Sequence, residues 1–313
     1  MSAFPTGWFR DDAAVEAATV AISAMQSTSC VFGDHVEFRG YAQRQIQQGR
    51  FGHFPHIAEK KLFGQFLPAF FQRRGTCVGQ GTGRAVQDAW LSALVQRDEV
   101  GVAAEVALEV IYAGARIQIG GGRVGSGDGA VGAWAAQFVA KYGLVRRGVY
   151  GRYDLSKPAE NYAVEWGAPG RGVPDDVLKL GASVKVRCYR CMSGDEVMDA
   201  AYTPGVALAM CGGYTFGPKD ANGMSRLSQP ANHCTELVGG FVTTGGNPGV
   251  LGQQSWGAGN PKGTSTLQYK GGSIEMREGM CGVPLEDVVK VGLQNAGEIW
   301  AFQIDHGKGF REQ

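Results

Sequence analysis

The chain has 313 residues, of which 44% are apolar, enough to bury a substantial core in one elaborated domain. Lys and Arg total 30 against 29 Asp and Glu, so the formal charge is +1. This balance excludes the clustered basic excess of a nucleic-acid-binding protein. No apolar run approaches the roughly 18 residues that a membrane-spanning helix needs.

Glycine and cysteine usage narrows the class further. The 49 glycines are about twice the usual share of roughly 7%, which predicts many tight turns and ordered loops. Seven cysteines, an odd number, argue against a complete disulfide framework. Residues 1–10 hold no basic stretch followed by an apolar one, so we expect no signal peptide. We therefore expect a protein made in a reducing cytoplasm, or packed into a particle assembled there.

The first half of the chain is predicted to be mainly helical. Arg84–Arg97 carries apolar residues at the i, i+3, i+4, i+7 spacing of an amphipathic helix. The helix predicted at Ala130–Tyr142 ends before Gly143, a residue typical of helix C-caps. Two further helices are predicted at Asp11–Met25 and Ala103–Arg116, and ordered loops at residues 30–76 and Gly120–Gly129.

The second half is predicted to be mainly strands. Ser183–Tyr189 alternates as a half-buried strand does, and Asp195–Ala201 is predicted to be a short helix. Further strands are predicted at Val206–Met210, Cys234–Phe241, Gly249–Gln254, Gly272–Arg277 and Ile299–Ile304. Helices followed by strands are typical of the α+β class.

Cys77 is a candidate nucleophile. It follows Gly75-Thr76 and precedes a glycine-rich stretch that leads into the Arg84–Arg97 helix. The unpaired N–H groups and the positive dipole end of a helix favour a thiolate. A lone cysteine near a helix start is, however, more often a small buried hydrophobic residue.

His233 and Gln254 are the candidate partners of that thiol. His233 stands at the entry to an apolar strand, where an imidazole with an ordinary pKa near 6.5 can act as a base. The amide of Gln254 could accept a hydrogen bond from the ring, and Trp256 could shield that bond from water. A capping histidine and a packed surface turn are the plain alternatives.

Together these blocks resemble the papain-like (C1-type) cysteine proteases, roughly from Gln72 to Val283. In that family the histidine follows the cysteine by roughly 130–150 residues, compared with 156 here. The matching blocks are Gly75-Thr76-Cys77, Asn232-His233-Cys234 through Val238-Gly239, Gln254-Ser255-Trp256-Gly257, Gly272–Met276 and Met280–Val283. A closer similarity to C1-like proteins of tailed phages and bacteria involves Val78-Gly79, Arg116–Gly122, Asp128-Gly129, Tyr153–Ser156 and Gly309–Arg311.

The resemblance implies a papain-like α+β fold with a cleft between two subdomains. Residues 1–70 would be an N-terminal extension and loop region. Residues 71–180 would form the helical subdomain with Cys77, and residues 181–313 the β-rich subdomain with His233 and Gln254. It further implies a cysteine peptidase or amidase that acts on a peptide or protein without metal or cofactor. The similarity to phage proteins further implies a location in the virion, with other virion proteins as partners.

Two departures from the family pattern leave alternatives open. The family's oxyanion-hole glutamine lies six residues before the cysteine, whereas Gln72 lies five before Cys77, and Gln254 replaces the family's asparagine. In a second register, Cys77 fills an earlier family position and Gln80 occupies the nucleophile slot, which would make the protein inactive. The first register is favoured because it keeps Cys77, His233 and Gln72 together. The competing hypothesis is a weakly active or inactive papain-fold structural component of a virion.

Other chemistry-bearing residues are predicted to be structural. Cys188 and Cys191 form a Cys-x-x-Cys pair, but no second pair stands at zinc-ligand spacing. His53 and His56 are predicted to be packing and loop residues. The glycines of 120–127 lack the Lys-Ser/Thr that a phosphate loop requires.

Overall fold

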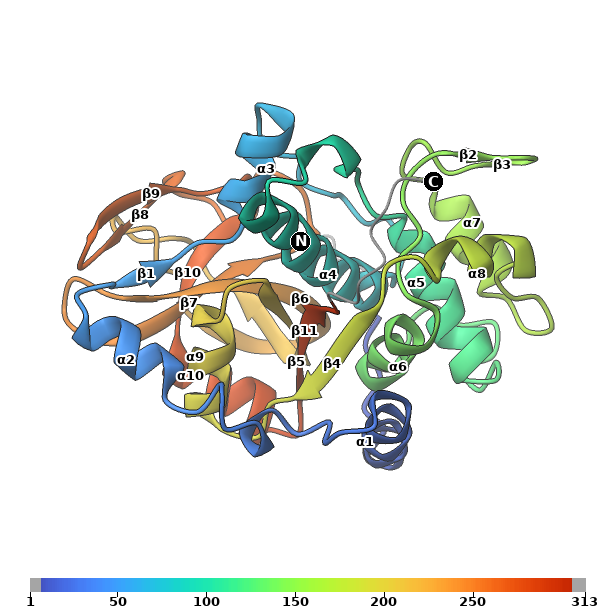
Figure 1. Cartoon of the computed structure of the whole chain (residues 1–313), viewed down its shortest axis with the longest axis horizontal. Coiled ribbons are helices and arrows are strands. Elements are labelled where there is room, and N and C mark those ends of the chain that lie inside the picture. Colours follow the sequence, from blue (N-terminus) through green and yellow to red (C-terminus); the bar gives the residue numbers. More distant parts are fainter. Residues whose placement is uncertain (1–6, 306–313) are drawn as a thin grey trace.

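A 21-residue helix, α4 (Cys77–Arg97), runs through the middle of the molecule, between a group of helices and a large sheet (Figure 1). The structure is a computed structural model that describes residues 7–305. Gly309–Arg311 and most of the 1–10 stretch, both used in the sequence analysis, lie outside the described residues. No helix within residues 7–305 is long and apolar enough to cross a bilayer.

Helix α4 begins seven residues before the predicted Arg84–Arg97 segment. The sequence analysis missed these first turns because they are rich in glycine. Glycine lowers helix propensity by about 1 kcal/mol, so the sequence pattern hides this part of the helix. The glycines are needed for close packing. A Cβ on Gly79 would lie 2.6 Å from the Cβ of Tyr112, and one on Gly81 would lie 3.0 Å from the backbone of Cys234. Helix α4 therefore approaches the sheet more closely than an ordinary helix could.

The structure confirms most of the other helices that were predicted in this half of the chain. The segment predicted as Ala103–Arg116 starts to be helical only at Leu108, because Val106 first pairs with Arg146 in a β-bridge. The elements are α1 (Asp12–Gln26), η2 (Val100–Val102), α5 (Leu108–Gly114), η3 (Ala115–Ile119), α6 (Gly132–Tyr142), the hairpin β2 (Val149–Tyr150) and β3 (Tyr153–Asp154), α7 (Glu160–Trp166) and α8 (Asp175–Gly181).

The prediction of an unbroken loop over residues 30–76 is wrong. This stretch contains η1 (Phe32–Asp34), α2 (Tyr41–Gln47), β1 (Gly52–His53) and α3 (Ile57–Phe63). Helix α2 is capped from a distant segment, since Asp199 accepts hydrogen bonds from the backbone N–H groups of Gly40 at 2.7 Å and Ala42 at 2.9 Å. A cap 157 residues away leaves no signal in the local sequence.

The sheet has seven strands in the order β10-β7-β6-β5-β11-β4, with β1 also paired to β6, and every pairing is antiparallel. This arrangement confirms the predicted α+β class. The strands are β4 (Val186–Arg190), β5 (Val206–Phe216), β6 (Leu227–Val242), β7 (Pro248–Gln253), β10 (Met280–Pro284) and β11 (Glu298–Ile304). The remaining elements are α9 (Gly194–Tyr202), the hairpin β8 (Thr266–Tyr269) and β9 (Gly272–Glu275), α10 (Leu285–Val289) and η4 (Lys290–Gln294).

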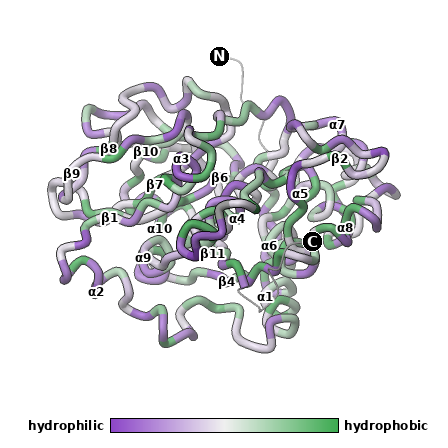
Figure 2. The backbone as a smooth tube through the Cα atoms, turned by 45° about the horizontal axis from the view of Figure 1, so that its top comes forward, coloured by the Kyte–Doolittle hydropathy of each residue, from purple (hydrophilic) through white to green (hydrophobic). Residues whose placement is uncertain are grey.

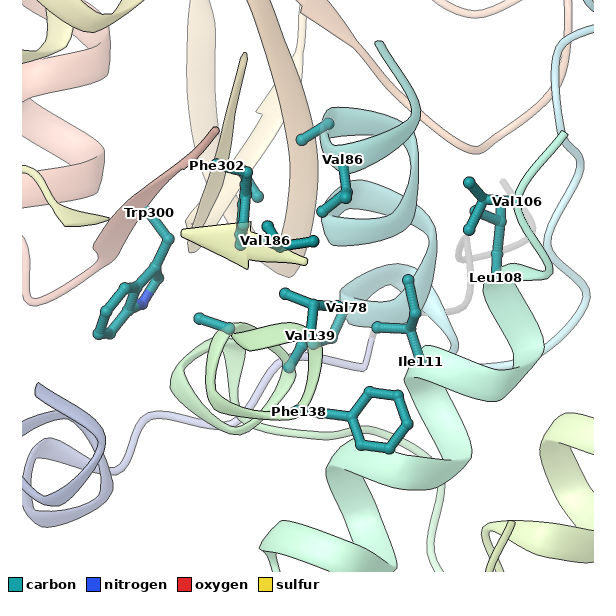
Figure 3. Packing of buried hydrophobic residues seen from close by; sticks show 14 of the residues in the cluster. Val78, Val86, Val106, Leu108, Ile111, Phe138, Val139, Val186, Trp300 and Phe302 are labelled. Atoms are coloured by element: carbon teal, nitrogen blue, oxygen red, sulfur yellow. The ribbon is translucent and has the colours of Figure 1, made fainter. Parts of the chain in front are cut away.

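Apolar side chains pack on both faces of the sheet, because successive residues of a strand point to opposite sides. One cluster joins α4, α5 and α6 to strands β4 and β11, and its members include Val78, Ile111, Val139, Val186 and Phe302 (Figure 3). The second cluster lies on the other face under α9 and α10, and its members include Val197, Leu208, Met210, Leu237 and Val250. Hydrophilic stretches are found mainly on outer elements such as α2 and α7 (Figure 2).

A buried ion cluster joins α4 to the sheet. Arg277, 1% exposed in its side chain, lies 2.8 Å from Glu59 of α3, 2.8 Å from Asp88 of α4 and 2.7 Å from Glu236 of β6. Burial, followed by the negative charge of Asp88, raises the pKa of Glu236 well above its ordinary value. This shift favours the neutral form of Glu236, which lowers the repulsion among the three carboxyl groups. The cluster fixes α3 and α4 against the strand that carries His233.

We expect Arg277→Met to destabilise the protein by about 3–5 kcal/mol, because it leaves buried carboxylates without their cation. Arg226→Met is the matched control. Arg226 also pairs with two carboxylates, but its side chain is 65% exposed, so its loss should cost less than about 1 kcal/mol. Urea unfolding at pH 7 measures both free energies, and equal losses would contradict the importance of the buried cluster.

Candidate active site

Cys77 is the first residue of α4, and its side chain is fully buried. Thr76 occupies the N-cap without a side-chain hydrogen bond, so the positive end of the helix is not neutralised by a cap. Burial raises the pKa of the thiol to about 12, although the backbone N–H groups of Cys234 and Gly7 act in the opposite direction. The thiol is therefore neutral in this structure.

His233 lies on β6, where it pairs with Gly212 of β5. Its ring stacks on Trp256 with a centroid distance of 4.0 Å and an interplanar angle of 17°. Both ring nitrogens are buried and have no hydrogen-bond partner among the described residues. Burial lowers the pKa of the imidazole to about 3, so it is uncharged at neutral pH.

The structure brings the predicted nucleophile to the residue next to the predicted base. The backbone N–H of Cys234 contacts the sulfur of Cys77, and Cys234 directly follows His233. The imidazole nitrogens are not hydrogen-bonded to the thiol. The thiol therefore lies against the backbone beside His233, and the thiol and the imidazole are both closed off from water.

An N-terminal segment, residues 7–9, closes this site. Its Gly7 donates its N–H to the carbonyl of Asn232 at 3.3 Å, just before His233. A Cβ on Gly7 would lie 1.9 Å from the carbonyl oxygen of Gly75, so the backbone packs too closely there for a side chain. On the helical side, Ala130 donates to the Gly7 carbonyl at 2.7 Å and accepts from Phe9 N–H at 3.0 Å. The segment thus spans from the helical side to the sheet side directly over the thiol.

Gln72, the predicted oxyanion donor, is fully buried before α4. Its backbone N–H donates to the carbonyl of Ser255 at 2.9 Å, and its side-chain oxygen accepts from the Ser255 hydroxyl. The position of Gln72 is therefore fixed by the loop that follows β7, the same loop that holds Trp256.

The predicted hydrogen bond between Gln254 and His233 is absent. The side-chain oxygen of Gln254 accepts from the backbone N–H of Trp256, and its nitrogen donates to the carbonyls of Gly257, at 3.0 Å, and Asn260. The longer glutamine side chain folds back into its own loop. In this structure Gln254 holds the backbone of Trp256, and Trp256 in turn covers one face of the imidazole.

Gln80, the alternative occupant of the nucleophile slot, lies one turn inside α4. Its side chain is 5% exposed, and its oxygen has no hydrogen-bond partner among the described residues. It lines a small cavity together with Arg84, Cys234 and Gln253. The first helical position, where the orphan N–H groups favour a negative charge, belongs to Cys77.

A disulfide joins Cys211 and Cys234, which face each other across β5 and β6. The odd cysteine count does not reveal this pair, because only the strand register places the two side chains together. The other five cysteines are free and buried, including Cys188 and Cys191.

Within residues 7–305 no group of three or more His, Cys, Asp and Glu side chains has a metal-binding arrangement.

Several residues of the site have no signal in the sequence. Gly7 and Trp8 close the site from a segment that precedes the first helix, and Ala130 and Asn232 contact that segment through backbone groups alone. Backbone contacts do not depend on residue type, so composition and motif spacing could not identify them.

No protein-family model and no curated protein sequence matches the chain. Among solved structures, xylellain, a cysteine protease from Xylella fastidiosa, is 16% identical with a TM-score of 0.49, covering 77% of this chain and 84% of its own. The clostridial cysteine protease Cwp84 is 14% identical with a TM-score of 0.48, covering 82% and 58%. The bromelain protease from Ananas comosus is 12% identical with a TM-score of 0.45, covering 81% and 97%. With TM-scores below 0.5, we take no residue assignment from these similarities.

The burial of His233 predicts a specific pH dependence of stability. Its folded pKa of about 3 lies below the ordinary 6.5, so between these values the unfolded chain binds a proton that the folded chain does not. Relative to His233→Gln, the wild type should lose about 2 kcal/mol of unfolding free energy between pH 7 and pH 5. Urea unfolding at both pH values measures this difference, which should stay constant between pH 7 and pH 8. A constant difference down to pH 5 would mean that the folded imidazole accepts protons freely.

Proposed function

We propose that the chain is a papain-like cysteine peptidase in which Cys77 is the nucleophile and His233 is the base. One observation carries this proposal: the first residue of the central helix contacts the backbone of the residue that follows His233, 156 positions along the chain. A thiol at a helix N-terminus beside an imidazole is the arrangement that nucleophilic catalysis by cysteine requires.

The neutral states of Cys77 and His233 apply to the closed form, in which residues 7–9 cover the site. When residues 7–9 leave, water reaches the thiol and the imidazole. Because burial causes both shifts, the pKa of Cys77 then falls and the pKa of His233 rises. The N-terminal end of α4 and the N–H of Cys234 then stabilise a thiolate, and His233 carries its proton.

Hydrolysis then follows in two steps. The Cys77 sulfur attacks the peptide carbonyl, the C–N bond breaks, and the proton on His233 moves to the leaving amine. Water activated by His233 next cleaves the thioester and restores the thiol. The Gln72 amide and the Cys77 backbone N–H are the proposed donors to the oxyanion, and no metal or cofactor is required.

The proposed role of Gln254 differs from that of a direct partner of the base. Its oxygen fixes the backbone of Trp256, and the indole stacks on His233, so Gln254 positions the ring through the tryptophan. The sequence analysis expected Trp256 to shield a Gln254–His233 hydrogen bond, which is absent; the proposed role of the indole is instead to keep water from one face of the imidazole itself.

A second candidate function is that of a papain-fold structural component of a phage particle. It is favoured by the complete enclosure of the thiol and the imidazole, which makes the closed form inert. Its partners would be other virion proteins, and its location would be the virion, whereas a peptidase could act in the virion or in the bacterial cytoplasm.

Hydrolysis of fluorescein-labelled casein tests the proposal in the full-length Trp8→Ala protein, in which the closing segment loses its largest buried side chain. We expect Cys77→Ser in this background to lower the rate by roughly 10³-fold or more, because the hydroxyl is a much weaker nucleophile. Cys281→Ser, a second fully buried free thiol, is the control and should keep activity within about threefold.

A second variant tests the alternative register, in which Gln80 occupies the nucleophile slot. Gln80→Ala should leave the rate within about threefold if Cys77 is the nucleophile. Absence of hydrolysis in every protein, together with a Cys77 that iodoacetamide does not label below pH 7, would support the structural role instead.

A further inference from the structure

Three cysteines, which we call the three-cysteine centre, meet where α4 reaches the sheet. Cys234 of β6 is bonded to Cys211 of β5, and its backbone N–H contacts the sulfur of Cys77. All three side chains are at most 1% exposed and belong to the apolar cluster on the α4 face of the sheet. The nucleophile of the proposed peptidase therefore lies beside a disulfide, a group that thiolates attack.

The packing of the helices decides which end of the disulfide Cys77 faces. Residues four apart lie on one face of a helix, so Cys77 points to the same side of α4 as Gly81. A Cβ on Gly81 would lie 3.0 Å from the backbone of Cys234, so this face of α4 rests directly on Cys234. The sulfur of Cys211 instead lies against α6, where a Cβ on Gly132 would be 2.7 Å from it. Cys77 therefore faces the Cys234 end.

We propose that Cys77 exchanges with this disulfide when the site opens, so that a Cys77–Cys234 disulfide reversibly masks the nucleophile. The Cys77 thiolate attacks the Cys234 sulfur, the Cys211–Cys234 bond breaks, and Cys211 leaves as a thiolate. His233 accepts the proton that Cys77 loses, and the released Cys211 takes one up from solvent. One disulfide replaces another, so no oxidant or reductant is consumed. The proposal rests on the Cys77 thiolate of the proposed function but does not require hydrolysis.

The closing segment prevents this exchange in the closed form. Cys77 is then a neutral thiol, because burial raises its pKa to about 12, and a thiol is a far weaker nucleophile than a thiolate. The segment is also anchored beside the other end of the disulfide. The indole N–H of Trp8 donates to Glu298 at 2.9 Å, and Glu298 pairs with Cys211 across β11 and β5. Departure of residues 7–9 therefore removes contacts from both ends of the three-cysteine centre.

The masked state is reversible because the same chemistry runs backwards. In the reverse step the Cys211 thiolate attacks Cys234, restores the original disulfide and releases Cys77. A masked Cys77 can neither attack a carbonyl nor react with an alkylating agent. The exchange thus gives the opened protein an inactive resting state.

The connectivity of the cysteines tests the proposal directly. Full-length Trp8→Ala protein, purified without reductant, is held at pH 8, acidified to stop exchange and digested with pepsin. We expect mass spectrometry to find the Cys77–Cys234 linkage in at least about a tenth of the molecules, and at least about tenfold less of it in the wild type, whose closing segment is intact. Trp8→Ala protein that contains only the Cys211–Cys234 linkage would overturn the proposal.

A matched pair of variants separates proximity from random oxidation. Trp8→Ala/Cys211→Ser leaves Cys77 and Cys234 as free thiols, whereas Trp8→Ala/Cys234→Ser leaves Cys77 and Cys211. Both lose the same disulfide, so any loss of stability affects both. In a buffer of reduced and oxidised glutathione, the Cys77–Cys234 disulfide should form with at least about tenfold higher yield than Cys77–Cys211, because only side chains that already lie close together form a disulfide. Similar yields, including none in either protein, would contradict Cys234 as the partner.

Iodoacetamide labelling separates the exchange from the peptidase function. Labelling of Cys77 in Trp8→Ala protein should fall by the fraction of exchanged molecules, and dithiothreitol should restore it. Cys234→Ala in the same background removes the sulfur but keeps the backbone N–H, so labelling should be complete without reductant. Full labelling with hydrolysis but no exchange would overturn the inference and leave the peptidase function intact. Exchange without hydrolysis would support the inference and contradict the peptidase function.

Discussion

The close contact between helix α4 and strand β6 is the constraint on which the site depends. Gly81 lies so close to the backbone of Cys234 that any side chain would have to displace one of them. This contact brings the start of α4 to the strand position that follows His233, so the thiol lies against the backbone beside the histidine. The ion cluster around Arg277 fixes the same helix and strand at a second point, two turns farther along α4.

The burial of Cys77 and His233 follows from the same packing. A thiol and an imidazole with no access to water both favour the neutral state, because the desolvation free energy of a buried charge exceeds its attraction to a single partner. The raised pKa of Cys77 and the lowered pKa of His233 therefore have one cause, burial. Residues 7–9, held by backbone hydrogen bonds and by the buried side chain of Trp8, form part of that enclosure.

The loop after β7 connects the two sides of the site. Ser255 holds Gln72, which precedes α4, while Trp256 covers His233 on β6. Gln254 bonds within this loop rather than to the base, so the support of the imidazole is indirect. A loop that contacts both Gln72 and His233 couples the position of one to that of the other.

The sequence by itself determined the α+β class, the helix at Arg84–Arg97 and most strands, because periodicity is a local property, and its short motifs selected Cys77 and His233 as candidate site residues. Only the tertiary structure decided that α4 begins at Cys77, since the glycines that weaken the local helix signal are required by packing against Tyr112 and Cys234. The hydrogen bonds of Gln254 likewise depend on the fold of its loop, because one added methylene changes which carbonyls the amide can reach. The cover of residues 7–9 and the acceptor at Glu298 bring together segments up to 290 residues apart, and no local pattern encodes such a contact.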